Sequence, residues 1–83
     1  MSREELAGLV RRALASVAPE SEGQLIDPEA DFRDQIDLDS MDFLNFIIAL
    51  HEATGLEIPE KDYPQLASLE GCTDYLSART KER

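Results

Sequence analysis

Reactive and metal-binding side chains are scarce in this chain of 83 residues. It has one cysteine, Cys72, one histidine, His51, and no tryptophan. A single cysteine excludes an internal disulfide and a cysteine-rich metal site, and the lone histidine has no second histidine at a metal-binding spacing. The sequence also offers no convergent set of catalytic groups. We therefore expect no metal ligands and no catalytic residues, and we expect that the protein is not an enzyme.

Positive charge and long apolar runs are also lacking. There are 8 lysines and arginines against 18 aspartates and glutamates, which gives a net charge of −10. This charge repels nucleic acid and anionic membrane surfaces and favours protein partners with basic patches. No apolar stretch is long enough for a transmembrane helix, and the charged start at Arg3, Glu4 and Glu5 is unlike a signal peptide. These absences predict a protein of the cytoplasm that does not bind membranes.

The remaining composition is that of one small folded domain, residues 1–83. Hydrophobic residues make up 42% of the chain, which is close to the globular norm. Ser2 and Glu5 have the spacing of a capping box, and the apolar residues that follow at helical intervals predict a first helix over about residues 3–18. Residues 19–38 are predicted to form a long loop. We expect the scattered apolar residues of this loop to hold it against the core.

The second predicted helix is unusually apolar and runs from Ser40 to Thr54, with Gly55 ending it. Apolar side chains cover most of its circumference, as expected for a central helix or one that a partner covers. After Pro59 we expect a short helix of little more than one turn, because Pro64 limits it. Ser68 then caps a last helix over about residues 69–80. The fold class is therefore all-α, a small helical bundle with three main helices and one short helix.

One hydroxyl lies where the polar loop meets the second helix. Asp39 and Asp42 flank Ser40-Met41, and acidic residues favour a helix N-terminus. Ser40 is either an ordinary residue of the helix start or an attachment point, because a helix N-terminus also favours a bound or attached phosphate. The hydroxyl alone leaves both interpretations open.

The segments around Ser40 resemble the acyl carrier protein family. The resemblance covers nearly the whole chain in order and spacing. The residues that carry it are Asp39-Ser40-Met41-Asp42, Ala49-Leu50-His51-Glu52, Leu56-Glu57-Ile58-Pro59, the segment from Leu69 to Leu76, and the Asp-Pro-Glu-Ala-Asp-Phe segment at 27–32.

This resemblance implies a specific function. A phosphopantetheinyl transferase would attach 4′-phosphopantetheine from coenzyme A to Ser40, and the thiol of this arm would carry an acyl group as a thioester. The chain would present this cargo to acyl-loading and acyl-processing enzymes of fatty acid, polyketide or related specialised biosynthesis. Asp39 would help to position the serine, a docking face would be formed by Met41, Asp42, Leu44 and Asn45, and the carrier would be a monomer.

The chain also departs from the family pattern. Asn45 and His51 stand where glutamates are usual, and Phe43 is larger and more apolar than the usual residue. The departures favour a discrete carrier of a dedicated pathway whose partners rely on apolar contacts. Two alternatives remain at this point: an aminoacyl or peptidyl carrier, and a helical interaction module that binds partners without modification.

Overall fold

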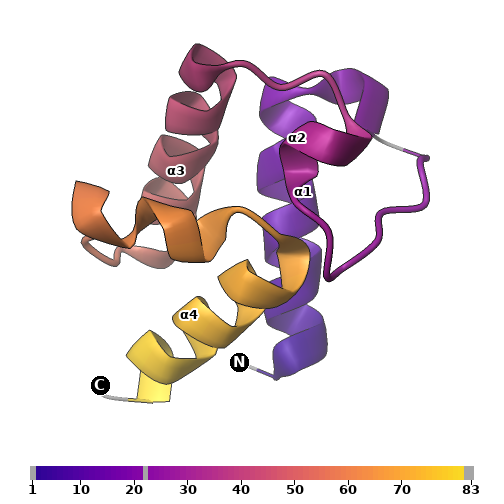
Figure 1. The fold of residues 1–83 in the computed structure, drawn as a ribbon. Helices are drawn as coiled ribbons and strands as arrows, with labels where there is room; N and C mark the ends of the chain where they lie inside the picture. Colours follow the sequence, from indigo (N-terminus) through magenta and orange to yellow (C-terminus); the bar gives the residue numbers. More distant parts are fainter. Residues whose placement is uncertain (1, 22, 82–83) are drawn as a thin grey trace.

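The computed structural model describes residues 2–21 and 23–81 and consists of helices and connecting segments (Figure 1). Its α-helices and 3-10 helices are α1 (Arg3–Val17), η1 (Pro19–Ser21), α2 (Phe32–Gln35), α3 (Ser40–Thr54), η2 (Glu60–Leu66) and α4 (Leu69–Lys81). The described residues contain no strand. The predicted all-α bundle with three main helices and a short one is therefore confirmed, with two further short helical turns, η1 and α2.

The first helix begins at the predicted capping box. The Ser2 hydroxyl accepts a hydrogen bond from the Glu5 amide (3.2 Å), and the Glu5 carboxylate accepts one from the Ser2 amide (3.1 Å). The backbone hydrogen bond from Ser2 also lowers the pKa of Glu5. The inner face of α1 buries Leu6, Val10 and Leu14, against which α3 and α4 both pack.

The segment over residues 19–38 is more structured than the predicted loop. Asp31 caps α2 by accepting a hydrogen bond from the Arg33 amide (2.8 Å), and Phe32 is buried against the bundle. The prediction that the apolar residues of this segment contact the core is wrong for Leu25, whose side chain is 100% exposed. Its neighbour Ile26 is partly buried and packs against the core instead.

Both predicted ends of α3 are confirmed. Gly55 adopts the left-handed conformation (φ 73°) and its amide donates to the His51 carbonyl oxygen (2.7 Å), as expected of a glycine that ends a helix. Phe46, Ile47 and Leu50 are buried, so one side of α3 contributes to the core and the opposite side faces outward.

The short helix after Pro59 is longer than predicted. η2 spans Glu60–Leu66 and includes Pro64. The proline therefore does not limit this helix to little more than one turn, contrary to the prediction from the sequence. Burial of Leu66 in the core adds a tertiary contact that the local sequence does not reveal.

The last helix begins as predicted, with the Ser68 hydroxyl accepting from the Gly71 amide (3.0 Å). Tyr75, which its spacing places near the edge of the inner face, is buried. Its hydroxyl donates to the Asp62 carboxylate (2.7 Å), and Arg79 pairs with the same oxygen (2.9 Å). These contacts tie η2 to α4.

Candidate functional site

Ser40 is the first residue of α3 and is exposed. The preceding residue, Asp39, caps the helix: its Oδ1 accepts from the Asp42 amide (2.8 Å), and Asp42 Oδ2 accepts from the Asp39 amide (3.5 Å). This reciprocal capping box fixes the backbone on both sides of the serine. The neighbouring Leu38 is buried and anchors the chain as it enters the helix.

The hydroxyl of Ser40 differs from the other Ser and Thr hydroxyls of the central part of the chain. Ser16 and Thr73 donate to backbone carbonyl oxygens one helical turn earlier, at 2.6 and 2.8 Å. Thr54 does the same at 2.7 Å, and the Ser68 hydroxyl caps α4. Ser21 is buried. Among the described residues from 6 to 76, only Ser40 combines an exposed side chain with a hydroxyl that makes no intramolecular hydrogen bond.

The backbone around Ser40 suits an attached phosphate. The amides of Ser40 and Met41 precede the first helical hydrogen bond, which runs from the Phe43 amide to the Asp39 carbonyl oxygen (2.9 Å). Unpaired amides and the positive end of the helix dipole attract an anion at this position. The carboxylates of Asp39 and Asp42 oppose that attraction. An exposed, unpartnered hydroxyl with such amides beside it fits a covalently attached phosphodiester.

An apolar strip runs along the outer face of α3 from the turn that contains Ser40. Its members are Met41, Leu44 and Ile48, with exposed fractions of 67%, 41% and 45%. Asn45 is exposed beside them, whereas Asp42 is partly buried at the flank. The structure therefore brings the predicted docking residues together around one helical turn. Ile48 was not predicted as part of this face, although its spacing from Met41 and Leu44 places it there.

A cluster of aromatic rings surrounds Phe43, one helical turn after Ser40. Phe43 packs against Phe46 (centroids 6.1 Å apart, planes at 43°) and edge-to-face against Tyr63 of η2 (6.1 Å, 78°). The guanidinium of Arg33 lies 5.9 Å from the centroid of the Phe43 ring. The sequence alone did not identify Arg33 or Tyr63, because they reach α3 from two other elements of the fold.

The lone histidine and the lone cysteine have structural contacts. His51 Nδ1 is hydrogen-bonded to the Leu56 carbonyl oxygen (2.7 Å), next to the end of α3. Cys72 is buried, its thiol donates to the Leu66 carbonyl oxygen (3.2 Å), and burial raises the pKa of the thiol. Cys72 is therefore part of the core. No group of potential metal ligands occurs among the residues that the structure describes.

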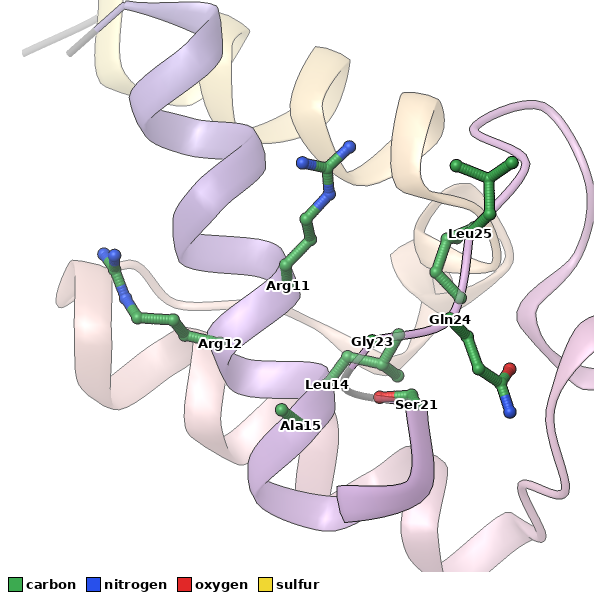
Figure 2. A pocket seen from close by; sticks show the side chains of 9 residues that line it. Arg11, Arg12, Leu14, Ala15, Ser21, Gly23, Gln24 and Leu25 are labelled. Atoms are coloured by element: carbon green, nitrogen blue, oxygen red, sulfur yellow. The ribbon is translucent and has the colours of Figure 1, made fainter.

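A hollow of about 370 Å³ lies between α1 and the segment that follows η1 (Figure 2). Leu14 and Ser21 line it, together with the exposed Leu25. Arg11 and Arg12 of α1 also line it. None of the lining residues belongs to α3, so the hollow is separate from the Ser40 site.

Comparison with known proteins agrees with this geometry. Residues 6–76 match the family described as "Phosphopantetheine attachment site". The chain is also 33% identical to the acyl carrier protein of Rubrobacter xylanophilus over 76 residues, which cover 92% of this chain and 93% of that protein. The chain therefore belongs to the phosphopantetheine-attachment family, as an acyl carrier protein. Phosphopantetheine is the group that this family carries.

The comparisons also bear on the wider class of function. Acyl carrier proteins are carriers rather than catalysts, and they act together with partner enzymes. Within the described residues, no helix has both the length and the apolar character that crossing a membrane requires.

Proposed function

We propose that Ser40 is the attachment residue for 4′-phosphopantetheine and that the chain carries its acyl group as a thioester on the thiol of this arm. Among the described Ser and Thr residues of the matched segment, only Ser40 offers an exposed hydroxyl without an intramolecular hydrogen bond. This observation carries the proposal. The helix N-terminus adds a local environment that favours the phosphodiester.

The loading step transfers a phosphoryl group between two oxygens. The Ser40 oxygen attacks the phosphorus that bears the pantetheine in coenzyme A and loses its proton. The new Ser40 O–P bond forms as the P–O bond to the adenosine bisphosphate breaks, and this nucleotide leaves. A phosphopantetheinyl transferase catalyses this step, whereas the carrier supplies an accessible hydroxyl on a rigid helix start.

Docking is the second part of the proposal. Met41 and Leu44 provide an apolar contact for the transferase and for acyl-loading and acyl-processing enzymes, and Ile48 extends this contact along α3. Asp39 and Asp42 lie at its Ser40 end, where they attract basic patches on those enzymes. Asn45 completes the docking face without adding charge.

The remaining features of the proposed carrier follow the sequence predictions. It works as a monomeric carrier of one domain over residues 1–83, in the cytoplasm, and it performs no catalysis itself. It serves fatty acid, polyketide or related specialised biosynthesis. The flexible arm keeps the acyl group close to whichever enzyme has docked and so raises its effective concentration there.

Incubation with coenzyme A and a phosphopantetheinyl transferase of broad specificity tests the attachment residue. Intact mass spectrometry should show one phosphopantetheine adduct on the wild type and none on Ser40→Ala. Ser16→Ala is the matched control, because Ser16 is exposed but its hydroxyl donates to the Ala13 carbonyl oxygen, and it should be modified like the wild type. An undiminished adduct on Ser40→Ala would show that another residue is the attachment point.

A further inference from the structure

Arg33 of α2 contacts an aromatic ring of α3 that lies one turn from the proposed attachment residue. Ser40 and Phe43 are three residues apart on α3, so their side chains are neighbours on the helix surface. The guanidinium of Arg33 lies over the ring of Phe43, 5.9 Å from its centroid. A cation from one element therefore lies next to the neighbour of Ser40 on another.

The Phe43 ring beneath this arginine is held by its own packing contacts. It is partly buried and is enclosed by Phe46 on its own helix and by Tyr63 of η2. A planar guanidinium on an aromatic face keeps its N–H donors at its edge, where they can reach an oxyanion. These two contacts limit the movement of the Phe43 ring, so the ring offers the guanidinium a fixed surface.

The guanidinium also retains donors for a further acceptor. Arg33 forms an ion pair with Asp31, in which Arg33 Nε lies 3.7 Å from Asp31 Oδ1. This is longer than a charge-assisted hydrogen bond, which is typically about 2.7–2.9 Å. By contrast, Arg3 and Arg79 are paired with carboxylates at 2.8 and 2.9 Å. The Arg33 side chain is 58% exposed and can turn toward a new anion.

A phosphodiester on Ser40 would lie in a strongly negative environment. A phosphodiester on Ser40 adds a negative charge to a chain whose net charge is already −10, and it does so between the carboxylates of Asp39 and Asp42. The amides at the helix start supply partial positive charge only. A full positive charge beside Phe43 would offset the repulsion from the two carboxylates.

We infer that Arg33 positions the phosphopantetheine arm: its guanidinium donates hydrogen bonds to the phosphodiester on Ser40 and holds the first part of the arm beside the Phe43 ring. The inference rests on the proposed function, because it requires an arm on Ser40. It assigns to α2, a helix of four residues, the role of carrying the cation that faces the attached phosphate.

The test compares the apo and holo forms of the full chain by nuclear magnetic resonance and thermal unfolding. In the wild type, attachment should shift the Arg33 Nε–H resonance. The phosphorus resonance of holo Arg33→Gln should differ from that of the wild type, and Arg33→Lys should restore part of the difference. The gain in melting temperature from apo to holo should be about 2–4 °C smaller in Arg33→Gln. Arg12→Gln, an equal change of charge at an exposed site on α1, should behave like the wild type.

The outcomes separate this inference from the function on which it rests. If the wild type acquires no arm, the proposed function fails and the role of Arg33 fails with it. If the arm attaches but the Arg33 Nε–H resonance does not move, and Arg33→Gln and Arg12→Gln give the same phosphorus resonance, only the inference is overturned. The wild-type spectra decide this even if one of the variants were poorly folded.

Discussion

Ser40 is available for modification because its neighbours satisfy the helix start without it. The side chain of Asp39 accepts the Asp42 amide, the usual task of a capping hydroxyl, and the serine occupies the next position with its own hydroxyl exposed. An aspartate cap therefore leaves the adjacent serine free to react. The local sequence predicted the helix start from its acidic residues, because capping depends on residues within one turn of each other, but it did not distinguish Asp39 from Ser40 as the capping residue.

The single cysteine makes the proposed arm easy to detect. Cys72 is fully buried and burial raises the pKa of its thiol, so little of the reactive thiolate is accessible at neutral pH. We predict that the native apo protein does not react with a chromogenic disulfide reagent until it is unfolded. The holo form should gain one rapidly reacting thiol, that of the arm, and Ser40→Ala treated in the same way should gain none. Rapid reaction of the native apo protein would contradict the buried position of Cys72.

At the scale of the element, helices with local signals at both ends were predictable and those held by distant contacts were not. The cap at Asp39 and the glycine at Gly55 define α3, and its predicted bounds are those observed. The length of η2 depends on packing of Leu66 into the core and on the bond between Asp62 and Tyr75, 13 residues apart. The same reason explains why Arg33 was not recognised, since its contact with Phe43 joins two helices.

Two helical glycines provide a matched test of packing between elements. A Cβ added to Gly71 would collide with the Gln65 carbonyl oxygen at the end of η2, whereas a Cβ on Gly8 of α1 would meet nothing within 4 Å. We predict that Gly71→Ala lowers the free energy of unfolding by about 1–3 kcal/mol through overpacking. Gly8→Ala should raise it by about 0.5–1 kcal/mol, because alanine is the better helix former. Thermal and urea unfolding measure both changes, and equal effects at the two sites would contradict the close approach of η2 to α4.

The hydrogen bond from Tyr75 of α4 to Asp62 of η2 also predicts that the free energy of unfolding depends on pH in the alkaline range. Burial, and next the hydrogen bond to Asp62, raise the pKa of Tyr75 to about 12, compared with about 10 for an unperturbed tyrosine. The folded state therefore keeps a proton that the unfolded state loses between these pH values. The stabilising contribution is complete below about pH 10 and is lost as the pH approaches 12.

Removing the Tyr75 hydroxyl tests this contact. Tyr75→Phe should lower the free energy of unfolding by about 1.5 kcal/mol at neutral pH, because a hydrogen bond to a buried carboxylate is lost. The difference from the wild type should shrink as the pH rises through the range between the two pKa values, since only the wild type loses the Tyr75 proton there. Urea unfolding measured at several pH values gives this difference. A constant difference across the range would show that Tyr75 does not titrate in the way its surroundings imply.

At the scale of the whole molecule, strong negative charge and a local apolar strip make separate contributions to partner binding. The net charge of −10 acts over the Debye length, about 10 Å at 0.1 M salt, and mainly speeds encounter with basic enzymes. Burial of an exposed side chain such as Leu44 acts only on contact and is not screened. The two contributions can therefore be separated by changing the salt concentration.

Kinetics of phosphopantetheine loading at low and high salt test this division on the docking face. Leu44→Asp should raise the KM of the transferase for the carrier about tenfold, the equivalent of about 1.4 kcal/mol of lost apolar contact. This effect should persist at high salt, whereas the smaller effect of Asp42→Asn should largely disappear because salt screens the charge pair. Leu25→Asp is the control, since it places the same charge on a fully exposed leucine away from α3. Equal effects of Leu44→Asp and Leu25→Asp would show that added charge, rather than the strip along α3, determines binding, and the docking face would then have to lie elsewhere.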